Sequence, residues 1–368
     1  MNYYWIGARE SDIRTEKVFK GSITKYGTNS NSNISFAYSR KNYSEKDYLD
    51  FVKEQLTNIL NNDCDGKFIF SNAELAYKMP LEILNHCECL NSFSIITALN
   101  DKFFVRQYLS DVCKIPQNII ANGKLLKDIN FVRRIFNKQY DQFVVQKAIG
   151  GGGKTSFFLN KNDMTQIPNN EDFLITPYFK NSIPINVHCI IYNNDILILP
   201  PSMQLIINNF KFIGSDFCAI NNLDYNIKSE IYNYSYKISE KLQKIGVRGI
   251  FGLDFIIVNN EILLLESNLR FQGSTFLLNF GLNKLGISIY ELFINSFKNN
   301  ESNIDKAIFN TKINLSFYKL MNHIDLQIPL TPIAENYDGY CEISNMSDNA
   351  YKYNRIFSES IACFLRGN

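Results

Sequence analysis

The stretch that decides the fold is residues 247–275, VRGIFGLDFIIVNNEILLLESNLRFQGST. It holds two apolar runs, 251–258 and 262–265, on either side of the dipeptide Asn259-Asn260. Apolar runs of this length around two turn-forming residues predict a β-hairpin with a tight turn. We therefore expect two neighbouring strands that are buried in a sheet.

Three side chains on this hairpin carry oxygen atoms that could bind a metal ion. Asp254 is in the middle of the first strand, and Glu266 and Asn268 are at the end of the second, with Arg270 just beyond. Carboxylates among apolar residues are costly unless something pairs with them. Mg²⁺ takes such hard oxygen ligands together with phosphates and water, and an arginine fork can hold a phosphate oxygen. The alternative is a hairpin whose acids pair with surface lysines.

The composition is that of an ordinary globular chain. It has 368 residues, a net charge of +2, 8 cysteines and 3 histidines. This size allows two or three lobes, and so small a net charge favours neither nucleic acid nor an anionic membrane as partner. The cysteines form no C-x-x-C pair, which argues against zinc, and no apolar run is long enough to span a membrane. Because the polar start lacks a signal-peptide pattern, we expect a cytoplasmic protein with reduced thiols.

The first hundred residues predict a small α/β lobe. Apolar strands are expected at 3–6 and 67–70, and a helix at 43–60 lies between them with Ser44 as its cap. No residue in this part indicates a reaction by its spacing alone.

A second helix is predicted in segment 98–116, ALNDKFFVRQYLSDVCKIP. Its apolar positions have helical spacing, and Asn100 or Asp101 would be the N-cap. Lys102 then falls in the first turn. On spacing alone, Lys102 would be an exposed surface lysine.

A run of glycines interrupts segment 142–159, QFVVQKAIGGGGKTSFFL. Consecutive glycines form no stable element, but they can bring backbone N–H groups onto a phosphate. One interpretation is a P-loop, since Ala148-x-x-x-x-Gly153-Lys154-Thr155 fits a loose version of that motif. A P-loop must open into a helix, whereas the aromatic residues that follow favour a strand. We therefore prefer a strand, a glycine lid and a returning strand.

The later apolar segments predict a larger lobe. The expected elements are two strands around a kinked linker at 173–192, two strands at 196–212, helices at 228–245, 275–280 and 287–297, a strand at 313–320 and a terminal helix at 351–365. The strands at 196–212 should turn near Pro200-Pro201, and the helix at 228–245 should end at Gly246. His188 alternates with apolar neighbours, which favours a buried strand histidine over a catalytic base.

In this order the motifs resemble those of the ATP-grasp superfamily. The order is D-K-x-x-x-R-x-x-L, a strand lysine with a glycine lid, a kinked linker, and D-F…E-x-N-x-R-x-Q-G-S. The resemblance implies an α/β (α+β) fold in which two α/β lobes sandwich ATP beside a small N-terminal lobe. The implied domains are 1–98 for the N-terminal lobe, 99–179 for the small lobe with its lid, 180–300 for the large lobe with the metal site, and 301–368 for a C-terminal extension.

The resemblance also implies roles for individual residues. Asp254, Glu266 and Asn268 would hold two Mg²⁺ ions, with Mn²⁺ as an alternative. The implied catalytic residues are Arg270, Lys147 and Asn268. The weaker substrate candidates are Arg248, Gln272, Gly273, Ser274 and Gln204.

ATP is the implied nucleotide. Its binding residues would be Lys102, Lys147, Gly150, Gly151, Gly152, Gly153, Lys154, Pro177, Tyr178 and Phe179. The Pro177 carbonyl would accept from the adenine amino group, and the Phe179 N–H would donate to the ring. Thr176 stands where the family often has an acid, and no acid is placed for the ribose.

The implied reaction is ATP-dependent carboxylate–amine ligation. A carboxylate would attack the γ-phosphate to give an acyl phosphate and ADP, and an amine would then displace phosphate to form an amide or peptide bond. The expected substrates are amino acids or a small peptide of a specialised metabolite pathway. Loading of a carrier-protein thiol and a catalytically silent ATP-binding module remain open alternatives. The expected partners are small molecules, without nucleic acid or membrane, and a homodimer is an open alternative.

Overall fold

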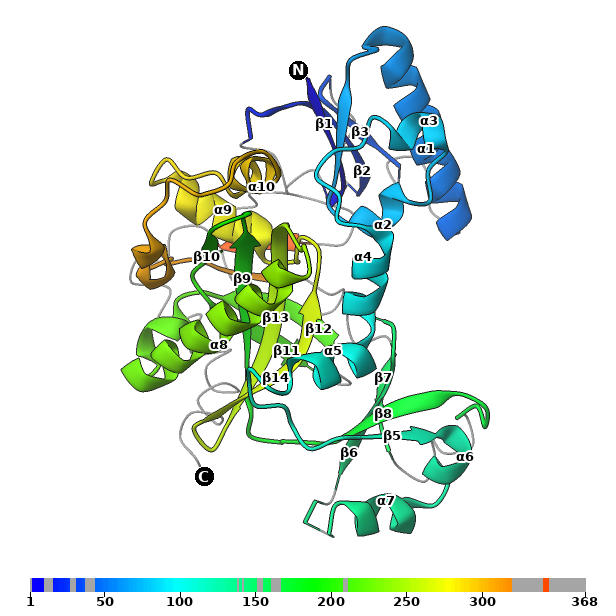
Figure 1. Ribbon diagram of the computed structural model, residues 1–368, viewed down its shortest axis with the longest axis vertical. Helices are drawn as coiled ribbons and strands as arrows, with labels where there is room; N and C mark the ends of the chain where they lie inside the picture. The colour runs from blue at the N-terminus through cyan, green and yellow to red at the C-terminus, as the bar shows by residue number, and fades with distance from the viewer. Residues whose placement is uncertain are drawn as a thin grey trace.

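Three β-sheets divide the chain into an N-terminal lobe, a small lobe and a large lobe (Figure 1). The structure is a computed structural model, and the residues that it describes are 2–9, 16–26, 31–36, 44–137, 139–140, 142–150, 155–159, 167–207, 211–319 and 340–343. The terminal helix predicted at 351–365 lies outside them. No helix in the described part of the chain has both the length and the apolar character that crossing a membrane requires.

The N-terminal lobe is a parallel sheet in the order β3-β2-β1-β4. Its strands are β1 (Tyr3–Arg9), β2 (Phe19–Tyr26), β3 (Asn33–Ser35) and β4 (Lys67–Phe70). Helix α1 (Glu45–Asn62) packs on this sheet through Tyr48, Val52 and Leu56. Its N-cap is Ser44, which exchanges hydrogen bonds with Asp47 in a capping box. Both predicted strands and the predicted helix with its cap are confirmed.

Short helices lead from this lobe to the others. They are α2 (Ala73–Ala76), α3 (Leu81–Leu84), α4 (Phe93–Asn100) and α5 (Lys102–Leu109). Asp101 caps α5, because its carboxylate accepts from the Phe103 and Phe104 N–H groups at 2.7 and 3.2 Å. Of the two caps predicted for this helix, Asp101 is therefore the one used. Helices α4 and α5 descend from the N-terminal lobe along the large lobe toward the small lobe (Figure 1).

The small lobe is an antiparallel sheet in the order β5-β8-β6-β7. Its elements are β5 (Ile119–Asn122), α6 (Gly123–Leu126), α7 (Ile129–Ile135), β6 (Phe143–Lys147), β7 (Ser156–Phe158) and β8 (Asp172–Pro177). A strand therefore follows the glycine run, as predicted. The P-loop interpretation is wrong, because that loop would have to open into a helix.

The large lobe is built on a sheet in the order β14-β13-β9-β11-β12-β15-β16, with β10 beside β9. Its elements are β9 (Ile183–Ile191), β10 (Ile196–Ile198), β11 (Ser202–Ile207), β12 (Lys211–Asp216), η3 (Ala219–Asn222), α8 (Tyr225–Lys244), β13 (Gly249–Val258), β14 (Glu261–Asn268), α9 (Thr275–Asn283), α10 (Ile289–Lys298), η4 (Lys306–Asn310), β15 (Ser316–Lys319) and β16 (Tyr340–Ile343). The two strands predicted around Pro200-Pro201 are confirmed as β10 and β11. A further strand, β12, begins at Lys211, where the prediction had the second strand ending at Phe212.

A glycine turn precedes the hairpin, and an asparagine turn joins its two strands. Gly246 takes φ +89° after α8, and the Val247 N–H donates to the Leu242 carbonyl in a Schellman motif. Asn259 and Asn260 take φ +49° and +64° between β13 and β14. Two consecutive positive φ angles define the type I′ turn that matches the twist of paired strands. The predicted hairpin and helix end are confirmed.

Aromatic packing joins the N-terminal lobe to the end of the hairpin. Trp5, the single tryptophan of the chain, is fully buried, with its ring edge-on to Phe271 at 5.0 Å and to Tyr290 at 5.1 Å. The Phe271 N–H also donates to the Ser71 carbonyl at 3.1 Å, at the end of β4. Phe271 directly follows Arg270, so the N-terminal lobe supports the loop that carries this arginine.

Candidate active site

The hairpin register brings the two predicted acids together. Asp254 on β13 lies opposite Glu266 on β14, and a bulge interrupts the register immediately after Asp254. Residues opposite each other on neighbouring antiparallel strands have their side chains about 5 Å apart at Cβ. The two-residue turn alone would place Leu265 opposite Asp254, and the bulge shifts the register by one residue so that Glu266 lies there instead.

Amide groups bridge and surround this carboxylate pair. Asn268 Nδ2 donates to Asp254 Oδ2 at 3.0 Å and to Glu266 Oε1 at 3.2 Å. Asp254 Oδ1 accepts from Asn186 Nδ2 and from Gln204 Nε2, each at 2.8 Å. The structure thus brings together Asp254, Glu266 and Asn268, the three predicted metal ligands, and adds Gln204 from the substrate candidates.

The two carboxylates, Asp254 and Glu266, have pKa values that are shifted in opposite directions. Burial, together with the neighbouring Glu266 charge, raises the pKa of Asp254 to about 7. Burial alone would raise the pKa of Glu266, but the Lys102 ammonium and the hydrogen bond from Asn268 hold that pKa below its ordinary value. Lys102 Nζ lies 3.2 Å from Glu266 Oε2. One carboxylate is therefore stabilised as an anion, while the other needs an additional cation.

The donor set fits Mg²⁺ rather than a metal that is held by the protein alone. Among the described residues, no group of three or more His, Cys, Asp or Glu side chains could hold a metal ion. Two carboxylates and an amide oxygen are the small set that Mg²⁺ uses when phosphates and water complete its octahedron. The Asn268 NH₂ group now lies between the carboxylates, and a rotation of this amide would present Oδ1 there instead.

Lys102 and Arg270 meet the acids at one cavity. This cavity of about 200 Å³ is lined by Asn72, Glu74, Leu99, Asn100, Lys102, Val105, Ile149, Gly150, Glu266, Ser267, Asn268 and Arg270. Lys102 Nζ donates to the Gly150 carbonyl at 2.5 Å, and Arg270 Nη2 donates to Asn268 Oδ1 at 3.2 Å. The predicted phosphate lysine, the first lid glycine and the predicted catalytic arginine therefore share a cavity with two predicted metal ligands.

Lys147 takes a different position. Its Nζ pairs with Glu171 Oε2 at 2.6 Å, both side chains are about half exposed, and Lys147 does not line the cavity. Its N–H donates to the Thr155 carbonyl across the base of the lid hairpin. The predicted lid residues Gly151, Gly152, Gly153 and Lys154 lie outside the described residues, so only Gly150 of the glycine run can be placed. The role of Lys147 in binding ATP stays a prediction.

At the end of β8, the Pro177 carbonyl takes no part in the hydrogen bonding to β6. The Tyr178 N–H donates to the Gln142 carbonyl at 2.9 Å, beside the pair formed by Pro177 and Phe143. Bonded and non-bonded pairs alternate in an antiparallel ladder, so the Pro177 carbonyl faces away from β6. The Tyr178 ring packs edge-on against Phe158 at 4.8 Å. This orientation leaves the Pro177 carbonyl available for the adenine contact predicted for it.

The weaker substrate candidates separate into two groups. Gln272 Oε1 accepts from Asn186 at 2.9 Å, and Ser274 Oγ donates to the same Asn186 at 3.3 Å, so both lie beside the acid cluster together with the intervening Gly273. Gly252 makes room for Gln272, since a Cβ there would lie 1.5 Å from Gln272 Nε2. Arg248 is at the other end of β13 from the acids. Its Nη1 donates to the Val247 carbonyl at 2.7 Å, so the structure does not bring Arg248 to the cavity.

Arg106 is a site residue that motif reasoning missed. It is 3% exposed, its Nη1 donates to Thr176 Oγ1 at 2.7 Å, and its Nε donates to the Leu265 carbonyl at 3.3 Å. Burial lowers the pKa of Arg106 to about 10, against the opposing effect of the Glu266 charge. Helical spacing could have identified it, because Arg106 follows Lys102 by four residues and therefore lies on the same face of α5.

His188 is buried and neutral, as predicted. Its Nε2 is 2.9 Å from Thr275 Oγ1, and burial lowers the pKa of His188 from 6.5 to about 3. Below pH 6.5 the unfolded chain binds a proton that the folded chain does not, so stability is lost as the pH falls from 6.5 toward 3. From pH 6.5 to 5 this loss should be about 1.6 kcal/mol, since the unfolded histidine is already half protonated at pH 6.5.

Urea unfolding at pH 6.5 and pH 5 measures this effect. The His188→Gln variant should show a smaller difference between the two pH values than the wild type does. His86→Gln is the matched control, since His86 is only half-buried in the N-terminal lobe, and it should keep the wild-type difference. Equal pH dependence in wild type and His188→Gln would contradict the assignment.

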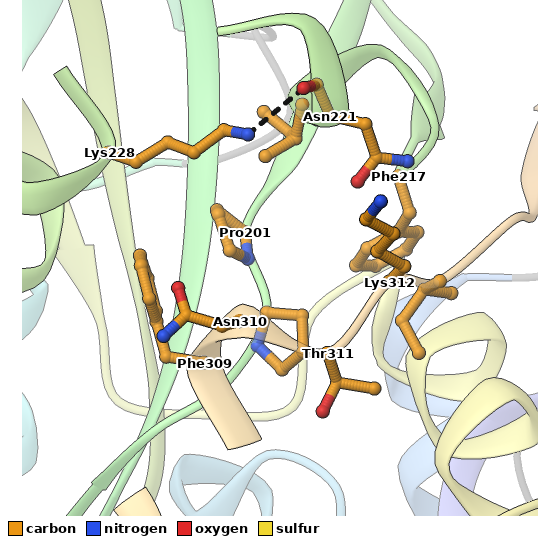
Figure 2. Close-up of a pocket in the computed structure, with 11 residues that line it drawn as sticks. Pro201, Phe217, Asn221, Lys228, Phe309, Asn310, Thr311 and Lys312 are labelled. Atoms are coloured by element: carbon orange, nitrogen blue, oxygen red, sulfur yellow. Dashed lines mark hydrogen bonds between the residues drawn. The ribbon is translucent and has the colours of Figure 1, made fainter. Parts of the chain in front are cut away.

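A second, smaller cavity lies apart from these residues. It measures about 70 Å³ and lies between the Pro200-Pro201 connection, η3 and η4 (Figure 2). Lys228 at its edge donates to the Asn221 carbonyl at 3.0 Å. None of the predicted site residues lines this cavity.

Comparisons with known proteins agree with this geometry. The family model described as an ATP-grasp domain matches residues 99–274. Among curated protein sequences, none matches this chain.

Solved structures show the same fold at low sequence identity. A biotin carboxylase–β-γ-ATP complex from Campylobacter jejuni has a TM-score of 0.69 at 14% identity, over 93% of this chain and 86% of that one. N5-carboxyaminoimidazole synthetase from Staphylococcus aureus, complexed with ADP, has a TM-score of 0.59 at 15% identity, over 96% of each chain. The biotin carboxylase domain dimer of Hydrogenobacter thermophilus 2-oxoglutarate carboxylase, with MgADP and bicarbonate, has a TM-score of 0.62 at 13% identity, over 86% of this chain and 74% of that one. The chain therefore contains an ATP-grasp domain at residues 99–274, and the solved structures show the same overall fold.

Proposed function

We propose that this protein is an ATP-dependent carboxylate–amine ligase that forms an amide or peptide bond through an acyl phosphate and releases ADP and phosphate. The observation that supports this most is the shared cavity, in which Lys102 and Arg270 lie beside Glu266 and Asn268, with Asp254 behind them. Anionic ligands and cationic side chains around one space suit the transfer of a phosphoryl group to a carboxylate.

The nucleotide would lie between the small and large lobes. Its adenine would meet the Pro177 carbonyl, and its phosphates would reach Lys102 and the start of the glycine lid. Lys102 would then exchange the Gly150 carbonyl for a phosphate oxygen. Asp254, Glu266 and Asn268 would hold Mg²⁺, which when bound neutralises charge on the phosphates.

The proposed reaction has two steps. First, a substrate carboxylate oxygen attacks the γ-phosphorus, the bond to the β-phosphate oxygen breaks, and ADP leaves with the electron pair. Second, the amine nitrogen attacks the acyl carbon, and phosphate leaves. Arg270 would hold the transferred phosphoryl group beside the carboxylate, and the lid would exclude water, which otherwise hydrolyses the acyl phosphate.

The substrates are proposed to be amino acids or a small peptide. The test is phosphate release from Mg-ATP, with ADP and AMP separated, across carboxylates and amines offered singly and in pairs. ADP that forms only when a carboxylate and an amine are both present supports the ligase. AMP would contradict the acyl-phosphate mechanism, because it indicates adenylation. ADP with one carboxylate alone favours a carrier-bound acceptor, and nucleotide binding without turnover favours a silent module.

A further inference from the structure

The cavity has a second wall that the proposed phosphoryl transfer does not use. Asn72 and Glu74 come from the start of α2 in the N-terminal lobe, and Asn100 comes from the end of α4. Both helices lie close above α5, which carries Lys102 (Figure 1). The two walls differ in charge, since one carries Lys102 and Arg270 with the single carboxylate of Glu266, whereas the other has a carboxylate and two amides and no cation.

The Glu74 carboxylate is oriented but not neutralised by a close ion pair. Its Oε2 accepts from Asn100 Nδ2 at 3.4 Å, and its side chain is 40% exposed. Lys78 Nζ is 3.9 Å from Glu74 Oε1, but it lies nearer to Glu45, at 3.1 Å. A half-exposed acid with a distant lysine retains its capacity to bind a cation.

Ser267 also lines the cavity, but its hydroxyl is buried and does not open onto it, because successive side chains of β14 point to opposite faces and Glu266 and Asn268 take the cavity side. The charged groups that face the space are therefore Lys102, Arg270, Glu266 and Glu74. Such a cavity is suited to a polar guest that reaches from the cationic side chains to Glu74.

We propose that Glu74 binds the ammonium group of the amine substrate, with the amide oxygens of Asn72 and Asn100 as further acceptors. This inference rests on the proposed ligase function and names its second substrate as a small cationic amine, such as the ammonium end of an amino acid. A phosphorylated acceptor is disfavoured, because its charge would be repelled by Glu74. The ammonium gives up one proton to solvent, and the neutral nitrogen then attacks the acyl carbon of the acyl phosphate from the side of Glu74.

Amine saturation kinetics test the assignment, with the amine that supports ADP formation by the wild type. Glu74→Gln should raise the KM for the amine about 10- to 100-fold, the usual effect of a lost hydrogen bond to a charged group. The KM values for ATP and for the carboxylate should stay within about twofold. Glu82→Gln is the matched control, since Glu82 is an exposed acid on α3 that does not line the cavity, and it should leave all three KM values unchanged.

Hydroxylamine separates this proposal from the function on which it rests. It is uncharged at neutral pH and traps acyl phosphates as hydroxamates without the amine substrate. Glu74→Gln should form hydroxamate at the wild-type rate. An unchanged amine KM in this variant, or an equal loss of hydroxamate formation, would overturn the role of Glu74. A wild type that forms neither hydroxamate nor ADP with any pair would instead overturn the ligase function, and the role of Glu74 with it.

Discussion

Asp254→Asn and Glu266→Gln should each lower Mg²⁺-dependent ADP formation by about 10²–10³-fold, because one well-placed electrostatic group typically contributes that much to a rate. Each variant keeps the size and hydrogen-bonding capacity of the side chain and removes one of the two charges that face each other across the hairpin. The measurement is ADP release at saturating Mg²⁺. The Mg²⁺-dependent part of the thermal stabilisation by ADP should disappear as well, which gives a readout that does not require the substrates.

Glu261→Gln is the matched control for these variants. Glu261 is an exposed acid on the same strand, β14, and its Oε1 pairs with Lys114 Nζ at 2.8 Å. Its loss should leave ADP release unchanged, since exposed ion pairs contribute little. Wild-type turnover in either Asp254→Asn or Glu266→Gln would exclude these residues as metal ligands.

Arg106→Ala should lower the free energy of unfolding by about 2–4 kcal/mol, because it leaves a cavity and removes hydrogen bonds from two acceptors. One acceptor is Thr176 Oγ1, next to the proposed adenine linker, and the other is the Leu265 carbonyl, next to Glu266. Arg106 thus joins β8 of the small lobe to β14, the strand that carries Glu266. We therefore expect weaker nucleotide binding as well as lower stability.

Urea unfolding and ADP titration measure the two effects. Arg106→Lys should recover only part of either, since an ammonium keeps the charge but lacks the planar fork that reaches two acceptors. Arg134→Ala is the control, because the Arg134 side chain is 65% exposed on α7 and its loss should change stability by less than about 0.5 kcal/mol. A wild-type urea midpoint in Arg106→Ala would show that Arg106 does not hold the two lobes together.

Local patterns predicted the elements of the site well. The turn at Asn259-Asn260 and the apolar runs beside it predict the hairpin that carries both acids, because both depend on residues adjacent in sequence. The bulge that puts Glu266 rather than Leu265 opposite Asp254 was not predicted. The spacing of α5 likewise predicts that Lys102 and Arg106 share one face. Strand β12 was harder to predict, because the apolar alternation of 202–212 is uniform and does not reveal that one strand ends at Ile207 and another begins at Lys211.

Contacts between segments that are far apart in the sequence could not be predicted from local patterns. Gln204 and Asn186 reach Asp254 from positions 50 and 68 residues away, and this depends on β9 lying beside β13 and β11 lying next to β9 in the sheet. Lys147 was expected to face the nucleotide from its strand, but its ammonium pairs with Glu171. Strand order and such pairings depend on loop closure and packing across the chain, and neither is encoded in local propensity.

Local sequence patterns were sufficient to predict the hairpin, the two acids on it and the strand that follows the glycine run, because each depends on neighbours within a few residues. Only the tertiary structure decided that Glu74 and Asn100 share a cavity with Lys102 and Arg270, and that Arg248 does not reach it. The physical reason is that a cavity forms where separate elements pack against each other. Its lining therefore depends on how the N-terminal lobe, α5 and β14 are brought together, which the side chains of no single segment specify.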